Sequence, residues 1–171
     1  MKKDEEYMAV ALQLARRAAD EGDIPVGAVV VAPDGRIVGR GRNRRRLEHD
    51  PTAHAEVVAL REASRELQSW NLSGCTLVVT LEPCPMCAGA LVQSRVSRLV
   101  YGCSDAKAGA CGTLYNIADD SRLSHRLEIT AGVMELRCRK ILQDFFLACR
   151  EKTKKRSGER RNSTKIEVSA C

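Results

Sequence analysis

Residues 75–87 read CTLVVTLEPCPMC, a short β-branched run that passes directly into a cysteine-containing turn. The run 75–81 is typical of a buried strand, because it is short, apolar and rich in valine and threonine. Pro85 is favoured in the first turn of a helix, so a helix is expected to begin there. This places Cys84 at the helix cap and Cys87 three residues further on, on the same face. A strand that leads at once into a helix is typical of an α/β domain.

The rest of the chain continues this alternation of helices and strands. Apolar spacing predicts helices at about 4–21, 53–69 and 134–154, and strand-like runs at 25–32, 36–41, 98–103 and 128–133. The segment 104–127 contains several glycines and is expected to be mostly loop, with room for a short helix. The pattern predicts a three-layer α/β domain in which one sheet is flanked by helices.

Length and composition limit the class of protein. A chain of 171 residues has room for one domain and a short appendage. Its 44% hydrophobic and 29% charged residues are ordinary for a globular domain and exclude disorder of the whole chain. No apolar run approaches the roughly 20 residues that span a bilayer, and the N-terminus has no apolar signal-peptide core. We therefore expect a cytoplasmic protein without a membrane partner.

The positive charge is concentrated in two places. The formal net charge is +6, and the stretch 150–171 has eight lysines and arginines against three glutamates. We expect a basic, flexible tail at 151–171 after a folded domain at 1–150. Such a tail either attracts phosphates or is a solvated extension, and the sequence leaves both interpretations open. The second cluster lies inside the folded part and favours a nucleic-acid partner; it comprises Arg40, Arg42, Arg44, Arg45 and Arg46.

Two short motifs carry candidate chemistry. Eight cysteines without a secretory signal do not indicate a disulfide scaffold, and six of them are expected to be buried or spare thiols. Cys84 and Cys87 differ because they form a C-x-x-C motif one strand downstream of His54-Ala55-Glu56. Asp50 or Thr52 is expected to cap the second helix, which would place His54 and Glu56 near its start. A redox cysteine pair is the weaker interpretation of this spacing.

One imidazole and two thiolates form a good zinc-binding set, and three protein ligands leave the fourth tetrahedral position open. An open position is typical of catalytic rather than structural zinc. Zinc lowers the pKa of bound water from 15.7 to about 7. Glu56 lies two residues from a ligand and suits the role of general acid and base. The motif H-x-E…P-C-x-x-C is that of the zinc-dependent nucleobase deaminases.

The sequence resembles the bacterial tRNA-specific adenosine deaminases, within the cytidine deaminase-like superfamily, from about Tyr7 to Arg150. The zinc motif alone is shared across the superfamily. The resemblance is narrowed by the block 105–110, which reads DAKAGA, and by the pair Phe145-Phe146. The chain departs from the family at Arg44–Arg46, where a proline is common, and in its extended basic tail.

The resemblance implies a fold, a reaction and a set of site residues. The fold is a three-layer α/β/α arrangement around a central, mainly five-stranded mixed sheet, usually in a homodimer. The reaction is the hydrolytic deamination of adenosine to inosine at wobble position 34 of the arginine tRNA anticodon. The ligands of one zinc ion per chain are His54, Cys84 and Cys87, and Glu56 transfers protons. Substrate and RNA contacts in the anticodon stem-loop correspond to Asn43, Ile24, Ala55, Asp105, Lys107, Arg44, Phe146 and Arg150. We expect Phe145 to pack inward and Phe146 to be the RNA contact of the pair.

Two alternatives remain open at this stage. A free-base or nucleotide deaminase, similar to guanine deaminase, shares the zinc motif but has no need for the basic clusters. A non-catalytic RNA-binding module would use zinc for folding alone and would need a fourth protein ligand. The candidates for that ligand are Cys103, Cys111 and His125.

Overall fold

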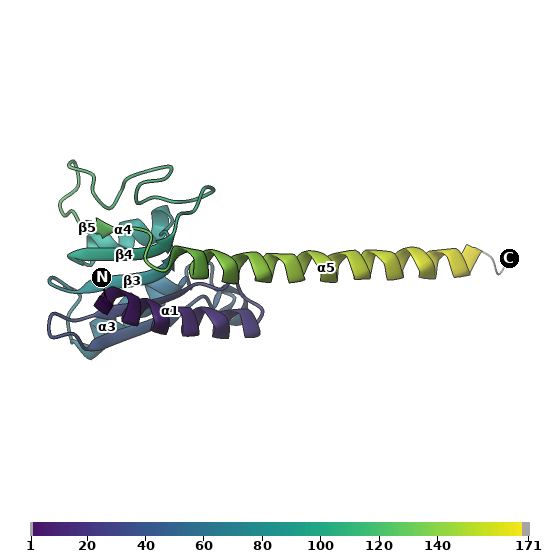
Figure 1. Ribbon diagram of the computed structural model, residues 1–171, viewed down its shortest axis with the longest axis horizontal. Helices are drawn as coiled ribbons and strands as arrows, with labels where there is room; N and C mark the ends of the chain where they lie inside the picture. Colours follow the sequence, from purple (N-terminus) through teal and green to yellow (C-terminus); the bar gives the residue numbers. More distant parts are fainter. Residues whose placement is uncertain (1, 169–171) are drawn as a thin grey trace.

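The computed structural model describes the backbone of residues 2–168 and the side chains of residues 2–153 (Figure 1). Its helices are α1 (Lys2–Asp20), α2 (Arg45–Glu48), α3 (Ala55–Glu66), α4 (Pro85–Gln93) and α5 (Glu135–Val168). Its strands are β1 (Gly27–Val31), β2 (Ile37–Arg42), β3 (Thr76–Leu81), β4 (Arg98–Cys103) and β5 (Glu128–Thr130).

The five strands form one mixed sheet in the order β2-β1-β3-β4-β5. Strand β1 is antiparallel to both β2 and β3, whereas β3, β4 and β5 are parallel. Four strands therefore point the same way and β1 alone is reversed. This confirms the predicted five-stranded mixed sheet.

Helices cover both faces of this sheet (Figure 1). One core lies between the sheet and the pair α3 and α4, and it includes Ala59, Leu77 and Leu91. The other lies between the sheet and the pair α1 and α5, and it includes Met8 and Val100. The predicted three-layer α/β/α architecture is confirmed, because the central strands are buried on both faces.

Glycine allows α3 to lie directly against β2. A Cβ atom at Gly41 would come within 1.9 Å of the Ala55 carbonyl oxygen and 2.6 Å of the Ala59 nitrogen. Since no side chain fits there, the first turn of α3 rests on the strand backbone. This contact fixes the start of α3 relative to the end of β2.

The predicted segments differ from the observed ones in three places. A four-residue helix, α2, follows β2 where no helix was predicted. The segment 104–127 has turns and an isolated bridge between Cys111 and Asn116, but no helix. Helix α5 continues to Val168, past the predicted end near residue 154, because the tail is rich in lysine, arginine and glutamate, which favour helix.

The predicted basic tail at 151–171 lies mostly beyond the described side chains, so its flexibility stays a prediction. Within residues 2–168, no helix is both apolar enough and long enough to cross a bilayer.

Candidate functional site

The strand directions bring distant parts of the chain to one edge of the sheet. Because β2, β3 and β4 point the same way, their carboxyl ends share this edge, and the reversed β1 begins there. Asn43 follows β2, Cys84 follows β3 by three residues, and Asp105 follows β4 by two. Ile24 precedes β1. Ligand sites of α/β sheets commonly lie at this edge.

His54 is the N-cap residue of α3, and its own side chain makes no capping hydrogen bond. The cap comes from Asn43, whose side-chain Oδ1 accepts a hydrogen bond from the Ala55 N–H at 3.0 Å. The prediction that Asp50 or Thr52 caps this helix is wrong. These two residues form a turn of their own, in which Asp50 Oδ1 accepts the Thr52 N–H at 2.7 Å. Capping by Asn43 leaves the His54 ring free to face the cysteines.

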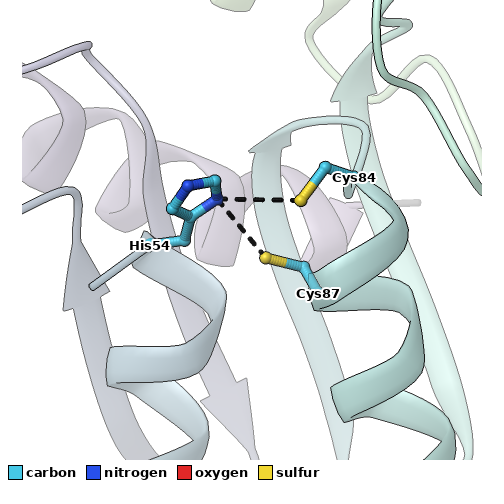
Figure 2. Close-up of side chains that lie close together, drawn as sticks. All are labelled: His54, Cys84 and Cys87. Carbon is cyan, nitrogen blue, oxygen red and sulfur yellow. Dashed lines mark hydrogen bonds between the residues drawn. The ribbon is translucent and has the colours of Figure 1, made fainter. Parts of the chain in front are cut away.

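The N-cap of α4 is Cys84, and Cys87 lies one turn further along the helix. The His54 Nδ1 atom lies 3.8 Å from Cys84 Sγ and 3.6 Å from Cys87 Sγ (Figure 2). The three donor atoms all lie within 4.8 Å of one another. Tetrahedral zinc, with Zn–S near 2.3 Å and Zn–N near 2.05 Å, separates N and S ligands by about 3.6 Å. The observed donor set therefore fits a zinc ion.

Other donors do not complete a four-ligand structural site. The Cys103 thiol donates to the Thr80 carbonyl oxygen, and the His125 ring bonds through Nε2 to the Val96 carbonyl oxygen. Cys111 is buried, and burial raises the pKa of its thiol to about 12. Among the described side chains, only His54, Cys84 and Cys87 form a possible metal-binding group. A zinc ion held by these three residues would therefore have its fourth tetrahedral position open as far as the described side chains are concerned.

The donor atoms and Glu56 are electrostatically linked. A hydrogen bond from the Cys87 thiol lowers the pKa of Cys84 to about 4, which favours its thiolate form. The same bond, together with burial, raises the pKa of Cys87. A hydrogen bond with Cys84 raises the pKa of His54. Burial raises the pKa of the Glu56 carboxyl to about 6, and Glu56 is only 4% exposed. A carboxyl of that pKa suits acid–base chemistry near neutral pH.

A groove of about 970 Å³ runs between α5 and the same edge of the sheet. Its lining includes five of the predicted RNA-contacting residues, namely Ile24, Asp105, Lys107, Phe146 and Arg150. We call it the α5 groove. Phe146 is exposed and Phe145 is half-buried, with the two rings edge to face at 5.6 Å. Asn43, Ala55 and Glu56 do not line this groove but lie beside the metal-binding group. Arg44 neither lines the groove nor lies in the metal-binding group.

The arginine cluster is less free than its sequence indicates. Arg42 makes a two-pronged ion pair with Glu21, and Arg44 pairs with Glu48 at 3.0 Å. Arg46 donates to the Gly22 carbonyl oxygen through its guanidinium, and its backbone N–H donates to the buried Asp23. The guanidinium groups of Arg40 and Arg45 have no hydrogen-bond or ion-pair partner in the described part of the chain.

Arg45 differs from Arg40 because its positive charge acts on the His54 ring. This charge lowers the pKa of His54, but the hydrogen bond with Cys84 raises it by more. Arg45 is exposed, and among the described residues its guanidinium has no ion-pair partner, so its charge is available next to the His54 ring. The sequence indicated the cluster but not which of its arginines have partners among the described residues.

Sequence reasoning also passed over Glu82. This carboxylate is 2% exposed and lies two residues before Cys84. It accepts backbone hydrogen bonds from three residues of the segment that follows β4. The only signal in the sequence is its place between a strand and Pro83, and that signal does not reveal partners 23 to 31 residues away.

The fold and the three-donor group with an adjacent buried glutamate define a zinc-dependent deaminase of the cytidine deaminase-like superfamily. A family model described as the cytidine and deoxycytidylate deaminase zinc-binding region matches residues 1–103. The chain holds one zinc ion, which the donor set fits.

Known relatives narrow this class. The chain is 48% identical over 151 residues to a tRNA-specific adenosine deaminase of Haemophilus influenzae, covering 88% of this chain and 87% of that protein. It is 45% identical over 162 residues to a protein of the same name from Bacillus subtilis, covering 95% and 98%. A structure from a study of A-to-I editing by tRNA:A34 deaminases at the wobble position matches with a TM-score of 0.77 and 39% identity, covering 80% and 99%. The chain belongs to the tRNA-specific adenosine deaminase family.

Proposed function

We propose that this protein deaminates adenosine to inosine at wobble position 34 of the arginine tRNA anticodon. The observation that carries the proposal is the convergence of His54, Cys84 and Cys87 beside the buried Glu56. This group lies at the edge of the sheet that also forms the α5 groove. Relatives named tRNA-specific adenosine deaminase match most of the chain, which supports the same reaction and the same class of substrate for this protein.

In this proposal His54, Cys84 and Cys87 hold the zinc ion and Glu56 transfers protons. A zinc ion bound there lowers the pKa of water to about 7 and so supplies the nucleophile. Glu56 takes a proton from the water that adds to C6 of adenine and passes it to the ring nitrogen N1. Glu56 then moves the proton of the new C6 hydroxyl to the exocyclic amine, the bond between C6 and that amine breaks, and the amine leaves as ammonia. The net reaction consumes one water and yields inosine.

Asn43 has the geometry to orient the purine. Its Oδ1 is engaged by Ala55, whereas its Nδ2 donates to no group within the described part of the chain. These N–H donors are therefore available to an acceptor atom of the purine. The backbone at Ala55 forms a further wall of the base pocket, and the apolar side chain of Ile24 lines the α5 groove at the same edge of the sheet.

The α5 groove suits the RNA around the target nucleotide. A base in a stacked loop must be flipped out to reach a buried site, which costs a few kcal/mol. Phosphate contacts from Lys107, Arg150 and Arg45 can offset this cost, and the exposed ring of Phe146 can stack on a neighbouring base. Arg44 contributes to this surface when it exchanges Glu48 for a phosphate.

We also infer that the protein acts as a homodimer and in the cytoplasm, where tRNA is modified. Support for the dimer comes from large apolar side chains that are exposed on α4 and on the segment 104–127, including Met86, Leu114 and Tyr115. Light scattering coupled to size exclusion tests the dimer. A monomer at micromolar concentration would contradict it.

The function is tested with an arginine anticodon stem-loop that carries adenosine at position 34. The zinc-loaded protein is incubated with it, and inosine is measured by nuclease digestion and mass spectrometry. Matched controls are the same stem-loop with guanosine at position 34, free adenosine, free guanine and free cytosine. We expect inosine from the first substrate only.

Conversion of free guanine without conversion of the stem-loop would instead support the guanine deaminase-like alternative. No conversion of any substrate by protein with one zinc per chain would support the non-catalytic alternative.

A further inference from the structure

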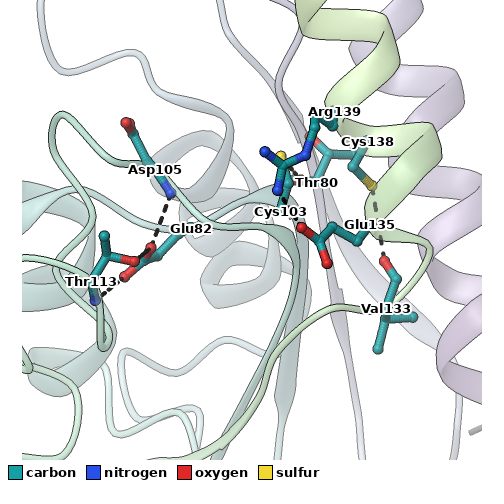
Figure 3. A network of polar contacts seen from close by, with 9 residues as sticks. All are labelled: Thr80, Glu82, Cys103, Asp105, Thr113, Val133, Glu135, Cys138 and Arg139. Carbon is teal, nitrogen blue, oxygen red and sulfur yellow. Dashed lines mark hydrogen bonds and ion pairs between the residues drawn. The ribbon is translucent and has the colours of Figure 1, made fainter.

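Glu82 is a buried carboxylate that the proposed chemistry does not use. It follows the last residue of β3 and is 2% exposed. Its Oε2 accepts the Asp105 N–H at 3.0 Å, and its Oε1 accepts the Thr113 N–H at 3.0 Å (Figure 3). Oε1 also accepts the Cys111 N–H at 3.0 Å. The Thr113 hydroxyl donates to Oε2 as well. One carboxylate is thus hydrogen-bonded to both ends of the segment 105–113.

The segment is built around this carboxylate. A Cβ atom at Gly109 would lie 2.3 Å from Glu82 Oε2 and 2.6 Å from the Asp105 carbonyl oxygen. Gly109 also donates its N–H to that Asp105 oxygen, and the Ala110 N–H donates to the Pro83 carbonyl oxygen. The chain therefore wraps closely around the Glu82 carboxylate, and only glycine fits at position 109.

Within the described residues, the hydrogen-bond donors to the Glu82 carboxylate are three backbone N–H groups and the Thr113 hydroxyl. Within the described part of the chain, no arginine or lysine forms an ion pair with it. Burying a carboxylate without an ion pair is costly unless its hydrogen-bonding capacity is filled. A shorter side chain would leave all three N–H groups without their acceptor, and a neutral glutamine would keep only one acceptor oxygen. The carboxylate therefore specifies one shape of this segment.

The segment leads into the α5 groove. Asp105, which donates its backbone N–H to Glu82, lines the groove together with Ala106 and Lys107. The Asp105 side chain in turn accepts the Lys107 N–H at 2.8 Å. The position of Lys107 thus depends on Asp105, and that of Asp105 on Glu82.

We propose that Glu82 is a positioning residue that fixes the segment 105–113, and through it sets Asp105 and Lys107 for contact with RNA. It acts on substrate affinity and not on the chemical step or on metal binding. The link to RNA rests on the proposed function. The hold of Glu82 on the segment 105–113, which we call the clasp, rests on the hydrogen bonds alone.

The clasp is tested by hydrogen exchange on the zinc-loaded protein. In Glu82→Gln, one oxygen still accepts the Cys111 and Thr113 amides, but the Asp105 amide loses its acceptor. In Glu82→Ala, all three lose it. We expect the Asp105 amide to exchange at least about tenfold faster in both variants, and the other two only in Glu82→Ala. Zinc stays at one per chain.

Thr113→Val removes only the hydroxyl contact and is a milder variant that retains the carboxylate. It should loosen the same segment less, and should add little in the Glu82→Ala background because its partner is already gone. Glu128→Gln is the matched control, since Glu128 is exposed on β5, away from the segment. Unchanged exchange at Asp105 in Glu82→Ala, or loss of zinc from Glu82→Gln, would overturn the proposal.

The RNA link is tested by steady-state kinetics on the stem-loop. We expect KM to rise about tenfold in Glu82→Gln while kcat changes less than about threefold, as when binding is lost without loss of transition-state chemistry. A fall in kcat with unchanged KM would overturn it. If the wild-type protein does not convert the stem-loop, the proposed function fails, and the exchange measurement still decides the clasp.

Discussion

At the residue scale, burial separates the roles of two neighbours on α3. His54 is half-buried and faces the two cysteines, whereas Glu56 is buried and its carboxyl pKa is raised to about 6 by that burial. The sequence predicted both near a helix start, and the structure agrees, with His54 at the N-cap. Two residues that would point apart in mid-helix can serve one site only at such an end.

Glu56→Ala should leave zinc content and folding intact. Turnover should fall by a factor of about 10² to 10⁴, the usual contribution of a general acid–base catalyst. Metal analysis, thermal unfolding and the inosine assay check this result. The control is Glu66→Ala at the far end of the same helix. Loss of zinc from the Glu56 variant would show that Glu56 is a ligand.

Arg45 and Arg46 are adjacent in sequence but differ in what their guanidinium groups bind. Arg45→Gln should weaken stem-loop binding and reduce the slope of log K against log salt by about 1, because one phosphate contact is lost. Arg46→Gln is the matched control, since its guanidinium is already bonded to the Gly22 carbonyl oxygen. Filter binding from low to high salt measures both. Equal slopes for Arg45→Gln and the wild type would show that Arg45 does not contact the RNA phosphates.

At the element scale, the site depends on where two helices begin. Helices α3 and α4 follow strands that point the same way and pack on the same face of the sheet, so their N-termini meet at one edge. Helix N-termini favour anionic groups, which suits thiolates at the start of α4. The close contact of α3 with Gly41 fixes one half of this arrangement.

Gly41→Ala should destabilise the protein by about 1–3 kcal/mol, because the added methyl group would displace the first turn of α3. The same displacement should lower zinc affinity, since Ala55 follows His54 directly. Gly89→Ala in α4 is the control: a Cβ there meets nothing within 4 Å, so its effect should be neutral or stabilising by up to about 1 kcal/mol. Urea unfolding and zinc titration measure both variants. Equal stability of the two would contradict this account of α3.

At the scale of the whole molecule, two features stand out: the length of helix α5 and the concentration of basic residues at its end. Helix α5 has 34 residues and so extends about 51 Å, well past the sheet (Figure 1). The stretch 150–171 has eight of the chain's 28 lysines and arginines. A basic extension next to the α5 groove is suited to long-range attraction of RNA.

Deleting residues 156–171 should weaken tRNA binding at low salt, with the difference disappearing at high salt, because the deletion removes four basic and two acidic residues. The single-turnover rate at saturating tRNA should stay within about twofold, since the metal-binding group is far along the chain from the deletion. Binding titrations at two salt concentrations and a single-turnover time course test this. Unchanged affinity at low salt would make the tail a solvated extension only.

The sequence by itself determined the features that depend on near neighbours. The C-x-x-C spacing placed Cys84 at a cap and Cys87 one turn on, and Pro85 marked the helix start. Apolar periodicity located the strands and the main helices to within a few residues. These features follow from local backbone geometry and side-chain spacing, which a short stretch of chain already contains.

Only the tertiary structure decided which distant groups meet. Asn43 rather than Asp50 or Thr52 caps α3, and Glu82 holds a segment more than 20 residues away. Arg44 is paired with Glu48, whereas the Arg45 guanidinium has no partner among the described residues. These contacts arise because four strands point one way and collect their ends at one edge of the sheet. Pairing between residues far apart in the chain depends on packing of the whole sheet, and no local pattern encodes it.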